Sequence, residues 1–181
     1  YQTGHGSFTW IPCLTEEFGV EPALAKRIHD AWEVSCTAET TPLFDGVLET
    51  LDWLHERDVL TFILTARFRE STMVLLRSLE IHERFVEIVT HDDVENPKPH
   101  ADAFVPILNR LREHGIAESE CLFVGDTPTD LLTGRSAGIR TVIVRSGDFS
   151  HFEPHHDLVD DHVIASVKEL REWLHLKAAA A

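Results

Sequence analysis

The chain contains few cysteines, with only Cys13, Cys36 and Cys121 among its 181 residues. Three scattered cysteines make neither a disulfide framework nor a zinc motif of regularly spaced thiols. No apolar run approaches the roughly 20 residues that a helix needs to cross a bilayer. These absences lead us to expect a cytoplasmic protein in a reducing environment, with no membrane partner.

Basic residues are also scarce, since 16 Lys and Arg stand against 31 Asp and Glu and give a formal net charge of -15. Nucleic acids and anionic membranes both require a basic surface, so neither is expected as a partner. An apolar content of 43% over 181 residues is enough for one solid core with a small accessory lobe.

The pattern of the chain changes near Pro42. Before it the signals are helical, and Glu21-Pro22 predicts a helix start because proline fits the first helical turn. After it, short apolar strands alternate with amphipathic helices, which predicts an α/β fold with a parallel sheet covered by helices on both faces. Pro106 is expected to delay or kink the third of these helices. The expected strands cover 60–64, 85–89, 121–124 and 141–144, with a weaker one near 162–164, and the expected helices cover 46–56, 69–79, 101–113, 130–137 and 167–174.

An acidic loop follows one of the predicted strands, and ligands of such folds bind at the carboxyl ends of the strands. The strand before Gly125 runs into Asp126 and Asp130. Gly125 is expected to let the backbone turn sharply. Two carboxylates on one side of a helix start suit Mg2+. Asp130 is also typical of a helix-start aspartate favoured by the helix dipole, but that alternative does not explain Asp126.

Two other loops carry residues that handle phosphate. Thr65 follows the first strand, where its hydroxyl and the amides beyond it, beginning with Ala66, would hold a phosphoryl oxygen. Taken alone, Thr65 is more typical of an ordinary helix N-cap. Lys98 lies between Pro97 and Pro99, which restrict the backbone and aim the side chain. Taken alone, Lys98 is more typical of a surface lysine in a rigid turn.

Taken together, these loops form an ordered set of motifs on successive strands. The segments are Ile63-Leu64-Thr65, Lys98, residues 125–130 with Ala137-Gly138, and the apolar residues from 42 to 54. The set resembles the haloacid dehalogenase superfamily of phosphohydrolases, and most of all its phosphoglycolate phosphatases and beta-phosphoglucomutase-like members, which carry a helical cap. The resemblance implies a Rossmann-like α/β core at 42–174 and a remnant of the cap at 1–41. Residues 175–181 would be a tail whose alanines do not belong to the natural protein.

The resemblance also implies an activity. Members of this kind are Mg2+-dependent phosphohydrolases that cleave a small phosphorylated metabolite, here a phosphoglycolate-like compound or a sugar phosphate. A first aspartate attacks phosphorus to form an aspartyl phosphate, and a second aspartate two residues later acts as general acid and base. Thr65 and Ala66 would bind the phosphoryl group, and Lys98 would neutralise nucleophile and phosphate. Asp126 and Asp130 would hold Mg2+ directly or through water.

The first motif of the family, an apolar strand ending in Asp-x-Asp, is missing. Asp45 is followed two positions later by Val47 and has no apolar strand before it, so we interpret it as a cap for the next helix. The nucleophile strand, a central member of the sheet, is expected upstream of Tyr1. Two alternatives remain: a pseudoenzyme that keeps the fold and binds a partner or ligand, and a beta-phosphoglucomutase-like mutase.

Overall fold

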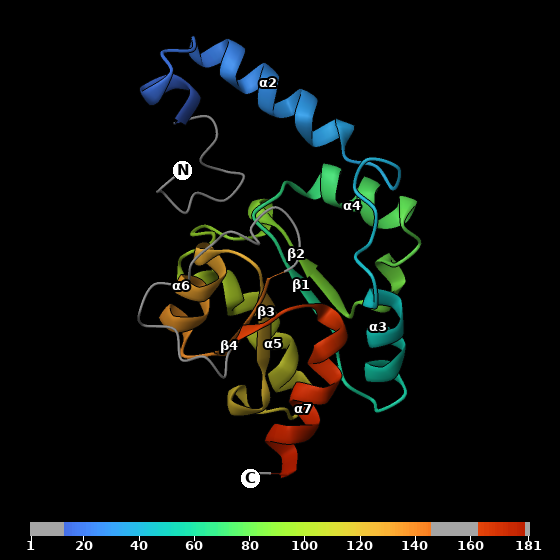
Figure 1. Ribbon diagram of the computed structural model, residues 1–181. Coiled ribbons are helices and arrows are strands. Elements are labelled where there is room, and N and C mark those ends of the chain that lie inside the picture. The colour runs from blue at the N-terminus through green and yellow to red at the C-terminus, as the bar shows by residue number, and fades with distance from the viewer. Residues whose placement is uncertain (1–12, 146–162, 180–181) are drawn as a thin grey trace.

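The structure is a computed structural model that describes residues 13–145 and 163–179 (Figure 1). Its paired strands are all parallel, as the alternation of strands and helices predicted. The α/β class is therefore confirmed. One sheet consists of β1 (Phe62–Leu64) and β2 (Glu87–Val89), and the other consists, in this order, of β3 (Leu122–Gly125), β4 (Arg140–Val144) and β5 (Val163–Ile164).

The helices lie close to their expected places. Pro106 lies in the first turn of α5, which begins at Val105 after a short 3-10 turn. Proline has no N–H group, so the first turn is where a helix tolerates it best. The last helix, α7, continues to Ala179 instead of ending at residue 174. The α-helices are α2 (Pro22–Ser35), α3 (Val47–His55), α4 (Arg69–Ser78), α5 (Val105–Glu113), α6 (Pro128–Ala137) and α7 (Leu170–Ala179), and the short 3-10 or π turns are η2 (Cys13–Glu17), η3 (His82–Arg84), η4 (His91–Asp93), η5 (Ala101–Phe104), η6 (Glu118–Glu120) and η9 (Val167–Glu169).

Side chains of β3 alternate between two hydrophobic cores. Phe123 belongs to the first core, which includes residues of α5, whereas Leu122 and Val124 belong to the second, which includes residues of α7. Because successive residues of a strand point to opposite faces, α5 and α7 cover opposite faces of this sheet. The buried members of the first core are Val89, Phe104, Ile107, Leu111 and Ile139, and those of the second are Val142, Val144, Ile164 and Leu170.

Two strand edges are unpaired within the described residues, one on β1 and one on β3. Both strands are apolar yet only half-buried, whereas β4, which has a neighbour on each side, is buried over residues 141–144. Phe62 of β1 packs against the same core as Phe123 of β3, so the two edges border one core. The sequence predicts a single sheet, and the described residues form two because no strand among them pairs with both edges. A central strand outside the described residues stays a prediction.

The start of α3 differs from the expectation. Gly46 is the N-cap, with a φ of 85°, and no side chain caps the helix. A left-handed conformation at this position favours glycine. Asp45 instead lies 3.1 Å from Nζ of Lys168 in an exposed ion pair between the start of α3 and η9. The interpretation of Asp45 as a helix cap is therefore wrong.

Helix α2 lies apart from the helices that cover the strands, above α4 in the view of Figure 1. The chain leaves α2 along α4, where the backbone N–H of Ala38 donates to Oγ of Ser78 at 3.1 Å. Over residues 13–145 and 163–179, every helix is too short or too polar to span a membrane.

Phe104 is expected to be a main stabilising residue of the first core. It is 5% exposed, and its ring meets the edge of Phe123 with 5.1 Å between centroids. Phe104→Ala should lower the free energy of unfolding by about 3 to 5 kcal/mol, because it opens a cavity and removes the ring pair. Urea denaturation measures this loss. Val105→Ala, at the exposed neighbouring position, is the control and should change stability by less than about 0.5 kcal/mol; equal losses in the two variants would contradict the assignment of this core.

Candidate active site

The acidic loop connects β3 to α6. β3 ends at Gly125, and α6 begins at Pro128 with Thr127 as its N-cap. Thr127 and Asp130 form a reciprocal capping box, which satisfies backbone N–H groups that the first helical turn leaves free. The helix therefore starts two residues before the expected position 130. Asp130 is both a helix-start aspartate and part of the acidic loop.

The Asp130 carboxylate holds this loop together. Its Oδ2 atom accepts hydrogen bonds from the backbone N–H groups of Asp126 at 3.2 Å and of Thr127 at 3.1 Å, and from Oγ1 of Thr127 at 2.7 Å. Its Oδ1 atom accepts a hydrogen bond from Nζ of Lys98 at 2.7 Å. Charge-assisted hydrogen bonds of this kind are the strong ones in proteins.

Gly125 makes room for that carboxylate. A Cβ atom at this position would lie 2.6 Å from Cγ and 2.8 Å from Oδ2 of Asp130. Gly125 is not among the glycines with positive φ, so the turn does not depend on a left-handed conformation there. The chain bends at residues 126 and 127, directly after Gly125, and the glycine also permits the close approach of Asp130.

Lys98 is largely buried, with 11% of its side chain exposed, and Asp130 is buried, with 6%. Nζ of Lys98 also lies 5.9 Å from the centre of the Phe123 ring. The alternative of a surface lysine in a rigid turn is therefore excluded. A buried charge needs a partner, and each of these two residues provides the other's.

The two aspartates have opposite pKa shifts. Burial raises the pKa of Asp126 above its ordinary value of 3.8, and the nearby Asp130 carboxylate raises it further. Burial also acts to raise the pKa of Asp130, but the charge and hydrogen bond of Lys98 together with the hydrogen bonds from Thr127 lower that pKa overall. Asp126 thus carries a negative charge that the described residues compensate incompletely, whereas Asp130 is well compensated.

Thr65 lies in a turn after β1. Its backbone N–H donates to the carbonyl of Val89 at 2.9 Å, and its Oγ1 atom accepts a hydrogen bond from the backbone N–H of Arg67 at 3.2 Å. The carbonyl of Arg67 accepts a hydrogen bond from the backbone N–H of His91 at 3.0 Å, which fastens this turn to the end of β2. The N-cap of α4 is Phe68, so Thr65 is not the helix cap of the alternative interpretation.

The structure brings some of the predicted site residues into contact and leaves others separate. Lys98, Asp126 and Asp130 are joined by hydrogen bonds, whereas no hydrogen bond links Thr65 or Ala66 to them in the described part of the chain. The strands that precede the loops of all these residues nevertheless pack against one hydrophobic core. The residues Leu64, Val89 and Phe123, which stand at or near the ends of β1, β2 and β3, pack in the same cluster.

Potential metal ligands are limited at this site. Among residues 13–145 and 163–179 there is no group of three or more His, Cys, Asp or Glu side chains placed to hold a metal ion. Asp126 and Asp130 are the two carboxylates present, and Asp126 is the one with the smaller number of protein partners. A metal here would therefore need further oxygen ligands from outside these residues.

Sequence reasoning missed Thr127, Arg67 and Glu33. Thr127 had a visible signal, because Thr-x-x-Asp before a helix is a variant of the capping box. Arg67 reaches from the Thr65 turn to α2, where its Nη2 atom lies 3.4 Å from Oε2 of the buried Glu33. No local pattern reveals this contact between residues 34 positions apart.

Comparison with known proteins gives the family. The family model for haloacid dehalogenase-like hydrolases matches residues 13–144. Pyrophosphatase PpaX of Halalkalibacterium halodurans is 34% identical over 140 residues, which are 75% of this chain and 61% of that protein. The phosphoglycolate phosphatase of Salmonella typhimurium is 30% identical over 119 residues, 66% of this chain and 46% of that protein. The chain thus spans only about half to three fifths of these curated relatives.

Solved structures share the fold. A haloacid dehalogenase superfamily hydrolase from Geobacter sulfurreducens is 28% identical with a TM-score of 0.61, covering 83% of this chain and 70% of that one. A phosphatase of the same superfamily from Thermococcus onnurineus is 20% identical with a TM-score of 0.63, covering 93% and 87%. Because the family model spans more than half of its residues, the chain belongs to the haloacid dehalogenase-like hydrolases, the family that its motifs resemble.

Proposed function

We propose that the protein is a Mg2+-dependent phosphohydrolase acting on a small phosphorylated metabolite, either a phosphoglycolate-like compound or a sugar phosphate. The observation that carries the proposal is the largely buried Lys98–Asp130 contact beside Asp126, whose pKa is raised by burial and by the neighbouring Asp130 carboxylate. The positively charged lysine can bind a phosphate group, and the carboxylate with too few positive partners can bind the metal ion that accompanies it. The relatives named pyrophosphatase and phosphoglycolate phosphatase support the same reaction class.

The phosphoryl group would be held by Thr65, Ala66 and Lys98. The Thr65 hydroxyl uses its oxygen to accept from Arg67, so its own proton stays available for a phosphoryl oxygen. The backbone N–H of Ala66, in the same turn, has no hydrogen-bond acceptor among the described residues. Lys98 would place its positive charge beside the phosphate while Asp130 holds its Nζ atom.

The carboxylates fit a hard cation that prefers oxygen ligands. Asp126 would be the direct ligand, and Asp130 would hold the loop and contribute directly or through water. Mg2+ bound there would neutralise charge on the phosphoryl oxygens. Asp130 already accepts four hydrogen bonds, which is why we assign the direct contact to Asp126 first.

The nucleophile must come from a segment that the described residues do not include. A strand inserted between the open edges of β1 and β3 would place a carboxylate at the strand ends that carry Thr65 and Asp126. An oxygen of this carboxylate would form a bond to phosphorus while the bond from phosphorus to the leaving-group oxygen breaks. A second aspartate would donate a proton to the leaving-group oxygen, and water would then hydrolyse the aspartyl phosphate. A pseudoenzyme would bind phosphate without this turnover, and a mutase would return the phosphoryl group to a sugar.

The domain division belongs to the same proposal. Residues 1–41, which include α2, would form part of a cap, residues 42–174 the core, and 175–181 a tail. A cap that closes over the site excludes water and selects the substrate. The cytoplasm is the proposed location.

Asp126→Asn tests the proposed metal role. The variant should lose most hydrolysis of p-nitrophenyl phosphate with Mg2+, and its Mg2+ affinity should fall at least about ten- to a hundred-fold. Without Mg2+ it should unfold at a higher temperature than the wild type at pH 7, since it removes a carboxylate whose pKa burial raises. Phosphatase assays and thermal unfolding with and without Mg2+ measure both effects. Wild-type activity in the variant would contradict the metal role of Asp126. Assays of the wild type with 2-phosphoglycolate, pyrophosphate and glucose 1-phosphate in parallel would distinguish the candidate substrates.

Asp130→Asn tests the loop-holding role. The pKa of Asp130 is lowered, so its contribution to stability is full above the ordinary value of 3.8 and is lost as the pH falls towards the lowered pKa. At pH 7 the variant should be destabilised by about 3 kcal/mol, because Lys98 stays buried without its charge partner. Urea denaturation at pH 7 and below pH 3.8 should show this difference shrinking at the lower pH. Glu113→Gln, in an exposed ion pair with Arg110, is the control and should cost less than about 1 kcal/mol at either pH.

A further inference from the structure

Helix α2 turns a polar face towards the rest of the protein. Its buried residues are Ala25, His29 and Glu33, at 0%, 3% and 5% exposure, spaced four residues apart on one side of the helix. Leu24 and Val34, by contrast, are 45% and 72% exposed. A helix that packs for hydrophobic burial alone does the opposite. The buried face of α2 therefore includes two polar side chains, His29 and Glu33, beside the small Ala25.

Glu33 is the centre of this contact. Its Oε2 atom accepts a hydrogen bond from Oγ of Ser71 in the first turns of α4 and lies 3.4 Å from Nη2 of Arg67. Nη2 of Arg67 also donates to the backbone carbonyl of Glu33 at 3.3 Å. The Arg67 guanidinium lies over the ring of Trp32, 5.1 Å from its centre. One residue of α2 thus holds two residues that follow the Thr65 turn.

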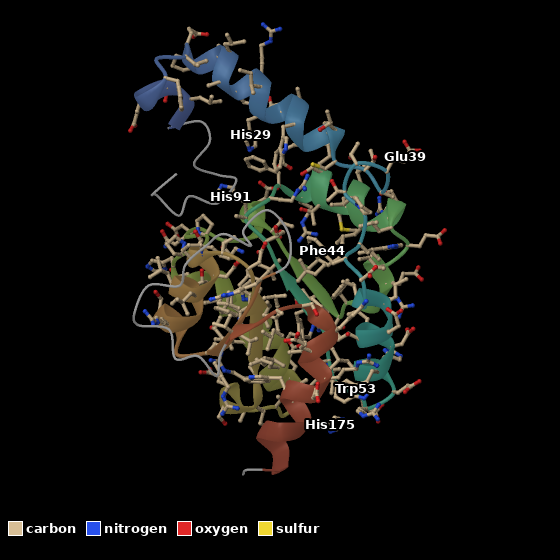
Figure 2. The ribbon with its side chains drawn as sticks, in the orientation of Figure 1. His29, Glu39, Phe44, Trp53, His91 and His175 are labelled. Carbon is tan, nitrogen blue, oxygen red and sulfur yellow. The ribbon has the colours of Figure 1, made fainter. Side chains whose placement is uncertain are left out.

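Aromatic rings line the same junction. The ring of Phe68 meets His29 edge-on at 5.8 Å between centroids and meets His91 edge-on at 5.2 Å. In Figure 2, His29 projects from α2 towards the region where His91 lies beneath it. The polar contact is shielded by these rings, so Glu33 and Arg67 interact away from bulk water.

Arg67 connects this junction to the phosphate-binding turn. Its side chain is held by Glu33, while its backbone N–H donates to Oγ1 of Thr65 and its carbonyl accepts from His91. A shift of the Arg67 side chain would therefore move the backbone group that orients the Thr65 hydroxyl. Within the described residues, Nε of Arg67 and Oε1 of Glu33 have no hydrogen-bond partner. Unsatisfied buried polar groups of this kind carry a desolvation cost, which weakens the contact between α2 and the turn.

We propose that Glu33 is a positioning residue, which holds the Thr65 turn in its phosphate-binding conformation through Arg67 and Ser71 when α2 lies on the core. The proposal rests on the proposed function, because it assigns Thr65 to phosphate. It makes phosphate affinity depend on the docking of α2. A purely structural ion pair would change stability and leave the geometry of Thr65 as it is.

Amide hydrogen exchange tests the positioning without any activity. In Glu33→Gln, the amide of Arg67 should exchange at least about five-fold faster, since its acceptor Thr65 is no longer held, while the amides of β4 stay as in the wild type. Ser71→Ala is the milder variant and should shift Arg67 exchange in the same direction. Glu39→Gln removes the same charge from an exposed position after α2 and is the matched control. Unchanged Arg67 exchange in a folded Glu33→Gln protein would overturn the proposal.

Binding of inorganic phosphate in the presence of Mg2+ tests the consequence. Glu33→Gln should weaken phosphate binding about ten-fold with little change in Mg2+ affinity, whereas Glu39→Gln should bind as the wild type does. In a Thr65→Val background, Glu33→Gln should change phosphate affinity by less than about two-fold, because it acts through the hydroxyl already removed. Equal losses in both backgrounds would contradict action through Thr65. Failure of the wild type to bind phosphate would count against the proposed function, and the exchange experiment would still decide the role of Glu33.

Discussion

The Asp130 carboxylate receives a hydrogen bond from Lys98, 32 residues earlier in the chain, and three more from Asp126 and Thr127. The rest of the site depends on this convergence. It brings the loop after β2 against the loop after β3, caps α6, and requires a glycine at 125 because no Cβ fits beside the carboxylate. Lys98 in turn can stay buried as a cation only because Asp130 is there. A lysine and an acidic loop from separate elements thereby become one unit.

The same carboxylate sets the properties of Asp126. Two acids four residues apart on one loop have pKa values shifted in opposite directions, since one has the lysine and the capping hydrogen bonds and the other has burial and a neighbouring negative charge. Environments that separate the pKa values of paired carboxylates commonly assign them different roles. Here Asp130 is the compensated carboxylate that organises the loop, and Asp126 is the undercompensated one that we propose as the cation ligand. A carboxylate kept in such an environment costs stability, as expected at a functional site.

The sequence predicted the candidate site residues that depend on local order. Thr65, Lys98 and Asp126 were predicted because each lies in a loop after a strand, and the parallel arrangement brings such loops to one end of a sheet. The structure joins Lys98, Asp126 and Asp130 by hydrogen bonds, and the functional roles of all these residues stay predictions. Roles that depend on contacts were less accessible: nothing in the sequence indicated that Gly125 also makes room for Asp130, and Asp45 looked like a cap until Gly46 proved to occupy that position. The contact of Glu33 with the Thr65 turn had no signal, since helical periodicity pointed to apolar residues of α2 such as Leu24 and Ile28, which are exposed. Tertiary pairing of polar groups leaves no period in a sequence.

The Thr65 turn, which we propose binds phosphate, receives little support from its own strand. β1, from which the turn leaves, is three residues long and half-buried, and within the described residues it is paired on one edge only. What holds the turn beyond that pairing is the backbone contact with His91 and the side-chain contact of Arg67 with Glu33. A short strand with an unpaired edge does little to fix the loop that follows it. The position of Thr65 therefore depends on the contacts that its turn makes with neighbouring elements. On the function that we propose, a strand added at the open edge would hold the turn from the core while α2 holds it from the other side, so that nucleophile, phosphate site and cap helix would become ordered together.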